Sequence, residues 1–133
     1  MTRAYNSNAI KCELDGIKFD SRAEMRYWRT LRLLERSEQI SDLEAHPKFE
    51  LQPAFTLLDE KHRAITYEAD MRYIEDGVIV IVDVKAMKWT RGKRKRIPVR
   101  DEFRRTKRLF LYRYKPKFES GEWRYEVVDA SNV

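Results

Sequence analysis

The clearest pattern in the chain is a short hairpin followed by a helix. Residues 11–19 have the pattern of two strands around Asp15-Gly16, a dipeptide that suits the positive backbone angles of a tight turn. Ser21 is a good N-cap, and Glu24 stands three residues later, as in a capping box. Apolar residues at helical spacing follow at Ala23, Met25, Tyr27, Trp28, Leu31, Leu33 and Leu34. The sequence therefore predicts a helix from Ser21 to about residue 37.

Strand patterns occupy the middle of the chain. Residues 40–55 are extended and irregular, and Pro47 and Pro53 favour edge strands or loops. Residues 65–74 alternate cleanly, which predicts one half-buried strand. One face of that strand would carry Ile65, Tyr67, Ala69, Met71 and Tyr73, and the other would carry Thr66, Glu68, Asp70 and Arg72.

The remaining elements complete a mixed α/β pattern. Asp76-Gly77 predicts a second hairpin turn, and Val78 to Val84 is a β-branched run typical of the centre of a sheet. Residues 86–98 are predicted to be a basic loop, residues 99–114 a helix and residues 123–128 a last strand. We expect one domain over residues 1–133, with a mixed central sheet flanked by two main helices.

Charge and cysteine content narrow the function classes. The net charge is +6, and residues 86–108 carry eleven basic and two acidic side chains, so the rest of the chain has a net charge of −3. This distribution favours a polyanionic partner, nucleic acid before membrane. Cys12 is the only cysteine, which excludes an internal disulfide and a cysteine-rich zinc site. Without an apolar membrane span or the apolar core of a signal peptide, the sequence predicts a soluble, cytoplasmic protein of a bacterial or phage-infected cell.

Two aspartates and a lysine fall where metal chemistry is expected. If the second hairpin has a two-residue turn, Glu75 lies opposite Val78, and counting back places Asp70 opposite Asp83. Opposed carboxylates repel each other at roughly 5 Å, unless a divalent cation lies between them. Magnesium typically takes one or two carboxylates from a protein. Lys85 lies two residues after Asp83 and so faces the same side, where it can orient or deprotonate water or neutralise a phosphate.

The helices add further candidates. Glu24 shares a helical stripe with apolar residues, which directs it toward the core, and Lys107 shares one with Phe103, Phe110 and Tyr114. Trp89 either stacks on an exposed base or packs under the basic loop. Backbone phosphates are expected to contact the basic residues Lys88, Arg91, Lys93, Arg94, Lys95, Arg96, Arg104 and Arg105.

Each candidate also has a simpler explanation. Glu24 is explained by the capping box with Ser21, and Asp70 by a solvated strand position. The D-x-K spacing of Asp83 and Lys85 occurs again at residues 59–61, and the basic run at residues 91–96 is explained by a solvated loop. The interpretation as a metal site rests on the agreement of separate observations. Counting from the turn places Asp70 opposite Asp83, and Glu24 and Lys85 are both expected to face inward.

The motifs FDSRAE (residues 19–24), TYEADMRYIEDG (residues 66–77) and VDVKAMK (residues 82–88) together resemble the PD-(D/E)XK nuclease superfamily. The resemblance is to its small phage-encoded branch and, more distantly, to Holliday-junction resolving endonucleases. It implies a restriction-endonuclease-like core of helix, three-strand meander, helix and strand. It also implies that Asp70, Asp83 and Glu24 bind metal and that Lys85 is catalytic, with Ser21 and Lys107 in support. Ala69 departs from the family's proline, and Ala86 from the glycine of many relatives.

The function implied by this resemblance is that of a Mg²⁺-dependent endonuclease, with Mn²⁺ as a substitute. Its substrate would be branched or four-way-junction DNA in phage recombination, replication or packaging, and cutting opposed strands would need a homodimer. No membrane partner and no small-molecule cofactor are expected. The alternative is a non-catalytic nucleic-acid-binding protein on the same scaffold. A third interpretation is an interaction protein whose basic loop docks an acidic partner.

Overall fold

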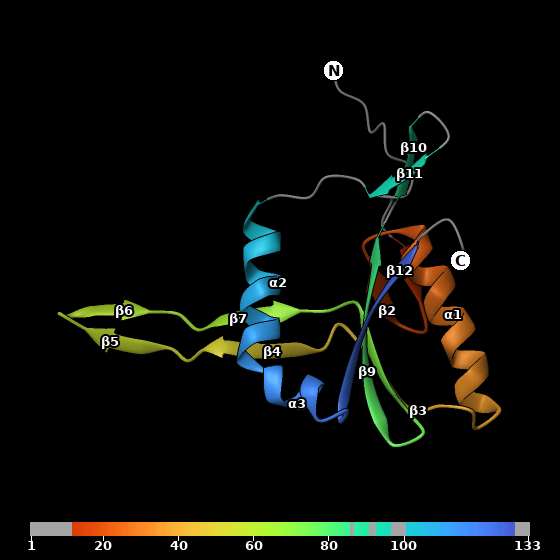
Figure 1. Ribbon diagram of the computed structural model, residues 1–133, viewed down its shortest axis with the longest axis horizontal. Helices are drawn as coiled ribbons and strands as arrows, with labels where there is room; N and C mark the ends of the chain where they lie inside the picture. The colour runs from red at the N-terminus through yellow and green to blue at the C-terminus, as the bar shows by residue number, and fades with distance from the viewer. Residues whose placement is uncertain (1–11, 86, 91–92, 97–100, 130–133) are drawn as a thin grey trace.

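A four-stranded mixed sheet forms the centre of the molecule (Figure 1). The computed structural model describes residues 12–85, 87–90, 93–96 and 101–129, with the backbone alone at residues 87–90, 93–96 and 101–103. The order of strands is β12-β9-β8-β3, with bounds β3 (Ser41–Ala45), β8 (Met71–Glu75), β9 (Val78–Lys85) and β12 (Trp123–Asp129). β12 runs parallel to β9, whereas the other neighbours are antiparallel. The predicted mixed α/β class is confirmed.

The N-terminal hairpin and helix lie where the sequence places them. β1 (Cys12–Leu14) and β2 (Ile17–Phe19) pair around Asp15 and Gly16, whose φ angles are 57° and 77°. α1 (Arg22–Arg36) follows, and its N-cap Ser21 accepts the backbone N–H of Glu24 through Oγ at 3.1 Å. The predicted turn, cap and helix are confirmed.

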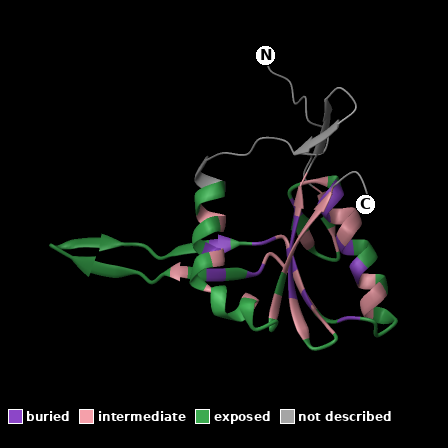
Figure 2. Ribbon diagram, in the orientation of Figure 1, coloured by how far each residue is buried: buried purple, intermediate pink, exposed green. Residues whose placement is uncertain are grey.

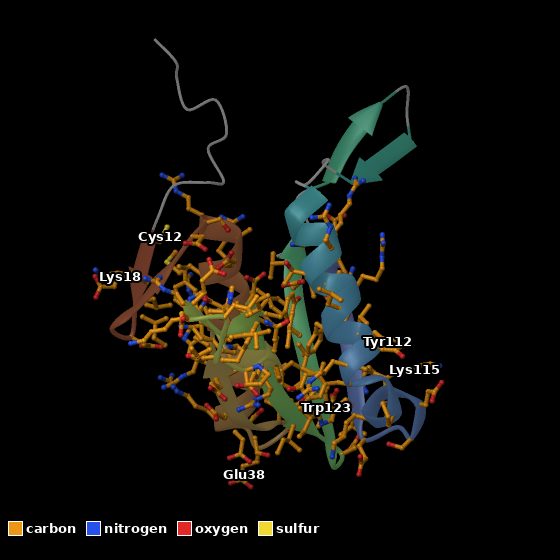
Figure 3. The ribbon with its side chains drawn as sticks, turned by 90° about the vertical axis from the view of Figure 1, so that its left-hand side faces the viewer. Cys12, Lys18, Glu38, Tyr112, Lys115 and Trp123 are labelled. Carbon is orange, nitrogen blue, oxygen red and sulfur yellow. The ribbon has the colours of Figure 1, made fainter. Side chains whose placement is uncertain are left out.

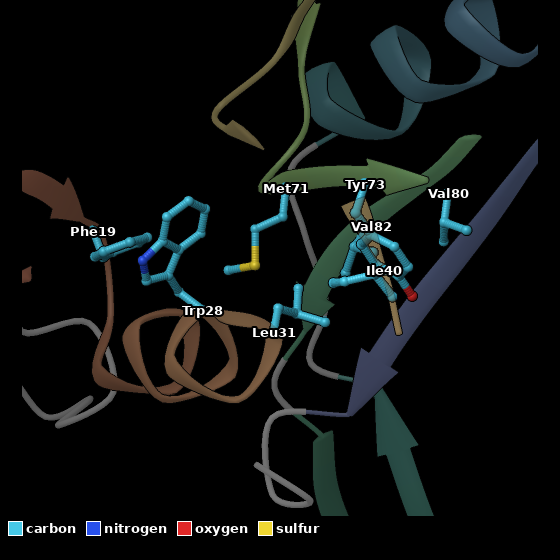
Figure 4. Close-up of a cluster of buried hydrophobic side chains, with 8 residues drawn as sticks. All are labelled: Phe19, Trp28, Leu31, Ile40, Met71, Tyr73, Val80 and Val82. Carbon is cyan, nitrogen blue, oxygen red and sulfur yellow. The ribbon is translucent and has the colours of Figure 1, made fainter. Parts of the chain in front are cut away.

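Alternate residues of β9 pack on opposite faces of the sheet. Val80 and Val82 belong to the cluster beneath α1, where Trp28 and Leu31 point toward the sheet (Figure 4). Ile81 belongs to the cluster on the other face. The period of two explains this division, because successive side chains of a strand point to opposite sides. A strand buried on both faces needs a near-continuous apolar run, as predicted for Val78 to Val84, where Asp83 is the one polar residue.

The second face is covered by α2 (Asp101–Arg113), which buries Phe110 completely. The predicted second helix is confirmed over these residues, and its expected start at Val99 lies outside the described part of the chain. The short α3 (Lys115–Glu119) follows, with Pro116 in its first turn. Proline suits a helix start and cannot continue a preceding helix, so α2 ends before it. None of the helices among the described residues is long and apolar enough to cross a membrane.

The prediction of one continuous strand over residues 65–74 is wrong. β7 (Ile65–Glu68) ends before Ala69, and β8 begins after Asp70. Two different partners hold the backbone at this break, because Ala69 donates its N–H to Pro47 O and Asp70 donates to Val82 O, both at 3.0 Å. β7 consequently pairs with β4 (Lys48–Gln52), and β8 pairs with β9.

The break also corrects the predicted faces. Tyr67 and Ala69 lie in the cluster beneath α2, whereas Met71 and Tyr73 lie in the cluster beneath α1. A continuous strand would have kept all four on one side. Ile65, predicted to be buried with them, is 45% exposed because it lies on the two-stranded ribbon described next.

A long β-arm extends away from the sheet (Figure 1). We define it as residues 48–68, in which β4 pairs with β7 and, further out, β5 (Phe55–Leu57) pairs with β6 (Glu60–His62). The prediction of edge strands or loops for residues 40–55 is confirmed, since β3 is the edge of the main sheet and β4 has one partner. Figure 2 shows that the outer half of the arm is exposed throughout. α2 packs against the base of the arm at β4 and β7.

The segment predicted as a basic loop contains a hairpin. β10 (Met87–Thr90) pairs with β11 (Lys93–Arg96), with Trp89 opposite Arg94. The loop prediction was wrong because it weighed charge above the strand propensity of Trp89 and Thr90. Residues 86, 91–92 and 97–98 of the predicted loop lie outside the described chain.

Candidate active site

The three predicted carboxylates meet at one end of the sheet. Glu24 comes from the first turn of α1, Asp70 from the break before β8, and Asp83 from the last part of β9. The side chains of Glu24 and Asp70 share a hydrogen bond, and the charge of Asp83 acts on both. Separate elements of the chain therefore supply one acidic cluster.

The position of Asp70 follows from the register of the second hairpin. Glu75 lies opposite Val78 and Met71 opposite Val82, so the predicted two-residue turn at Asp76-Gly77 is confirmed. Asp70 is next in line, but the backbone bends there, and its Oδ2 accepts the N–H of Val84 at 2.6 Å. The side chain thus takes the place of a backbone carbonyl in the ladder. This bond fixes the Asp70 carboxylate at the end of β9.

Asp83 is held by two tyrosine hydroxyls. Tyr67 donates to Asp83 Oδ2 at 2.5 Å, and Tyr125 of β12 donates to the same oxygen. Asp83 is only 2% exposed, so these donors replace the water that a carboxylate would otherwise need. Burial and the charge of Asp83 raise the pKa values of both tyrosines, which keeps the hydroxyls protonated as donors.

Lys85 supplies a positive charge beside the cluster. Its Nζ lies 4.0 Å from Asp83 Oδ2, and its side chain is 16% exposed. Both residues belong to β9 and are two positions apart, so the predicted common side is confirmed. The charge of Lys85 also lowers the pKa of Asp70, against the larger effects that raise it.

Glu24 is buried in an environment that disfavours its charge. Burial and then the charge of Asp20 raise its pKa to about 7, although a backbone hydrogen bond from Asp20 and the bond with Asp70 lower it. Its Oε1 is buried and has no hydrogen-bond partner among the described residues. Ser21 caps the helix through its own side chain, as the simpler explanation required, but that cap does not satisfy Oε1. A capping box alone therefore leaves this buried oxygen unexplained.

The pKa of Asp70 is raised as well. Burial, followed by the charges of Glu24 and Asp83, raises its pKa well above the ordinary value. A hydrogen bond between two carboxyl groups needs a proton on one of them, which agrees with raised pKa values in both Glu24 and Asp70. A solvated strand position, the simpler explanation for Asp70, does not describe this environment.

Lys107 and the arginines of α2 occupy different surfaces. Lys107 Nζ lies 4.9 Å from the centre of the Tyr125 ring, a cation–π contact directed at the sheet. Arg104 and Arg105 are exposed on α2. Side chains at positions 88, 89 and 93–96 are outside the described part of the structure, as is the whole of Arg91. The roles predicted for these basic residues and for Trp89 stay predictions.

One comparison with known proteins gives a match. A family model covers residues 4–120, which is most of the chain. The chain belongs to the family described as "Protein of unknown function (DUF1064)". No curated protein and no solved structure matches it.

Three neighbours of the cluster were missed by sequence reasoning. Asp20 precedes the helix cap, and its acidity inside the FDSRAE motif was the available signal. Tyr67 stands three residues before Asp70 on the buried side of β7, so it could have been suspected. Tyr125 gave no local signal, because its place depends on the parallel register that pairs Val127 with Asp83.

Carboxylate oxygens are the ligand type that a hard divalent cation takes. Among the described residues, no group of three or more His, Cys, Asp or Glu side chains is placed to hold a metal ion. Magnesium does not require one, since it keeps waters and phosphate oxygens beside one or two carboxylates. The unpaired Glu24 Oε1 and the raised pKa values of Glu24 and Asp70 describe a cluster that a cation would stabilise.

Proposed function

We propose that this protein is a metal-dependent endonuclease that hydrolyses DNA phosphodiester bonds at a PD-(D/E)XK site. The observation that carries the proposal is the convergence of Glu24, Asp70 and Asp83, with Lys85 beside them. One buried oxygen of Glu24 also has no hydrogen-bond partner within the described part of the chain. The order α1, β3, β8, β9, α2, β12 supports a restriction-endonuclease-like core, in which the β-arm is an insertion between β3 and β8.

Asp70 and Asp83 would hold Mg²⁺, with Glu24 assisting and Mn²⁺ as a substitute. The bound ion would supply Lewis acidity to a phosphoryl oxygen and lower the pKa of a water. The chain's own groups set up this chemistry. The Val84 N–H fixes Asp70, and the two tyrosine hydroxyls fix Asp83. The Lys85 ammonium would stabilise negative charge on the phosphate that is attacked.

We further propose branched DNA, a four-way junction before a linear duplex, as the substrate in phage recombination, replication or packaging. The support is the resemblance of the motifs and the basic segment of residues 86–108, whose contacts with phosphates would be independent of sequence. Such contacts recognise the shape of the nucleic acid more than its bases.

The decisive experiment is cleavage of a labelled four-way junction and a matched linear duplex by wild type and Asp83→Asn, with magnesium or with chelator. We expect metal-dependent cutting by wild type that falls by about 1,000-fold in the variant. Equal cutting of both substrates would keep the nuclease and reject junction preference. No cutting by wild type, together with tight salt-sensitive binding, would favour the non-catalytic nucleic-acid-binding protein.

A calorimetric titration with Mn²⁺ tests the metal site without any nucleic acid. We expect heat of binding in wild type and none in Asp70→Asn. The matched control is Asp59→Asn, which removes the aspartate of the other D-x-K triplet at an exposed position. Equal heats in all three proteins would reject Asp70 as a ligand.

A further inference from the structure

Exposed apolar side chains concentrate on one region of the surface. Of the seven large apolar residues that are exposed in the described chain, six lie on the β-arm or on the adjoining face of α2. These six are Phe55, Leu57, Leu58, Ile65, Leu109 and Tyr112. Scattered single apolar residues are normal on a protein surface, but exposed apolar residues gathered on neighbouring elements are typical of an interaction site.

The base of the arm contains a groove of about 510 Å³. Ile65 of the arm and Leu109 and Tyr112 of α2 line its apolar walls, and the basic residues Arg113 and Lys115 also line it, with Lys115 paired to Glu119 at 3.3 Å. Figure 3 shows Tyr112 and Lys115 on the same side of the molecule, from α2 and the start of α3. The groove therefore fits an apolar segment that carries negative charge.

The tip of the same arm has that chemistry. Leu57 and Leu58 are 60% and 85% exposed, and Asp59 and Glu60 follow them directly, before the basic residues Lys61 and Arg63. Glu60 Oε1 also lies 3.8 Å from His62 Nε2, so Asp59 is the acidic side chain at the tip that makes no ion pair within the described arm. At roughly 3.3 Å per residue, the tip and the groove of one copy lie about 20 Å apart, so a tip cannot fill its own groove. A second copy supplies both complementary features at the right spacing.

We propose that this protein forms a two-fold symmetric dimer in which two β-arms lie antiparallel and the tip of each occupies the groove of the other. The contact is self-complementary, because the same surface of each copy supplies one tip and one groove, and two such contacts close the assembly. Leu57 and Leu58 enter the apolar groove, while Asp59 and Glu60 meet the basic residues Arg113 and Lys115.

The backbone at Leu58 gives independent support. Leu58 has φ of 55°, a left-handed conformation that favours glycine or asparagine over leucine. The turn favours other residues at this position, and an apolar side chain gains nothing from contact with water. Burial of this side chain in a second copy accounts for the leucine.

The first test measures the oligomeric state by sedimentation and light scattering over a wide range of concentration. We expect wild type to form a dimer. We expect Leu58→Asn to dimerise with an affinity at least about tenfold weaker, because an apolar anchor is lost. Asparagine suits the left-handed turn, so this variant should fold. Leu33→Gln is the matched control, since Leu33 is also exposed but lies on α1. A wild type that stays monomeric, or an equal loss in the control, would overturn the proposal.

The second test is a disulfide across the contact, in a Cys12→Ser background. Leu58→Cys combined with Tyr112→Cys should give covalent dimers on oxidation, because a disulfide needs Cα atoms within about 7 Å. Each single cysteine should give none. Dimers from Leu58→Cys alone would mean that the tips meet each other and would overturn the antiparallel arrangement. Neither test contains metal or nucleic acid, so both are independent of the proposed nuclease activity.

Discussion

The acidic cluster and the β-arm depart from the usual distribution of side chains in opposite directions. The cluster buries carboxylates, with Glu24 7% exposed and Asp83 2% exposed, whereas the arm exposes leucines at its tip. Each departure lowers stability when the protein is alone, because buried charge loses hydration and exposed apolar surface orders water. The two regions thus need different partners, a cation and phosphate for the cluster and an apolar surface for the arm.

The contrast also separates two kinds of support. The cluster is fixed by hydrogen bonds from rigid elements, since β9, β12 and the end of β7 all contribute to the setting of Asp83. The outer arm, beyond the base that α2 covers, has only the strands β5 and β6, and a two-stranded ribbon is marginally stable in water. Chemistry that needs exact placement therefore lies in the sheet, and a contact that tolerates movement lies at the arm.

The largest expected effect comes from Asp70→Asn. The amide oxygen can still accept the Val84 N–H, but the charge that would bind metal is lost. We expect cleavage to fall by about 1,000-fold. We also expect the metal-free variant to be more stable than wild type at neutral pH, because burial and two neighbouring carboxylates raise the pKa of Asp70. Cleavage assays and urea unfolding check the two results.

A fall in both activity and stability would contradict this interpretation. It would mean that Asp70 is a structural residue whose bond to Val84 N–H depends on its charge. Glu38→Gln serves as the control, since it removes an exposed negative charge just beyond the end of α1 and should leave cleavage unchanged.

The second prediction concerns pH. The pKa of Glu24 is about 7 in the folded protein instead of 4.5, so the folded state holds this proton more tightly than the unfolded state. Stability therefore falls as pH rises from about 4.5 to 7, by about 3 kcal/mol from this group. Glu24→Gln should remove that part of the slope, measured as the difference in free energy of unfolding between variant and wild type without metal.

Glu38→Gln is the matched control for this measurement, because Glu38 is an exposed carboxylate just beyond the end of α1. Its free energy of unfolding should depend on pH in the same way as that of wild type. If Glu24→Gln also runs parallel to wild type, the buried unpaired oxygen of Glu24 does not carry the cost assigned to it.

Sequence reasoning located the parts of the site that depend on neighbours along the chain. The cap at Ser21 and the turn at Asp76-Gly77 are local signals, and they correctly fixed the helix start and the register of the second hairpin. The two-residue spacing of Asp83 and Lys85 placed them on one side of β9. These positions were predictable because each follows from a few adjacent residues.

Features that depend on distant partners were not predictable. The break at Asp70 interrupts an unbroken alternation, because Ala69 binds Pro47 while Asp70 binds Val82. The place of Tyr125 depends on a parallel register across a crossover through α2 and α3. The outer part of the arm was missed because its turn contains Leu58, which is not a turn-forming residue.

The third prediction tests the support around Asp83. Tyr67→Phe removes one of its two hydroxyl donors without changing the packing of the ring against Phe110. We expect a loss of about 1–3 kcal/mol in unfolding free energy, because a buried carboxylate loses a hydrogen bond. Cleavage should fall by about tenfold, since Asp83 is less well oriented. Tyr114→Phe is the control, because its hydroxyl binds Glu50 O in an exposed setting. Equal cleavage in Tyr67→Phe and wild type would leave Tyr67 with a structural role alone.

The smallest effect is expected at the tip of the arm. Leu58→Asn should raise the stability of the dilute monomer by about 0.5–1 kcal/mol, because asparagine tolerates the left-handed turn better than leucine. Leu57→Asn is the matched control, since Leu57 lies in β5 and asparagine is a poor strand former. The unfolding free energy of both variants is measured by tryptophan fluorescence, at protein concentrations too low for dimers to form. A gain in Leu58→Asn alone would show that the turn carries strain, whereas equal gains would assign the effect to exposed apolar surface. A gain in stability in Leu58→Asn alone, together with weaker dimerisation, would mean that Leu58 lowers the stability of the single chain and strengthens contact with a second copy.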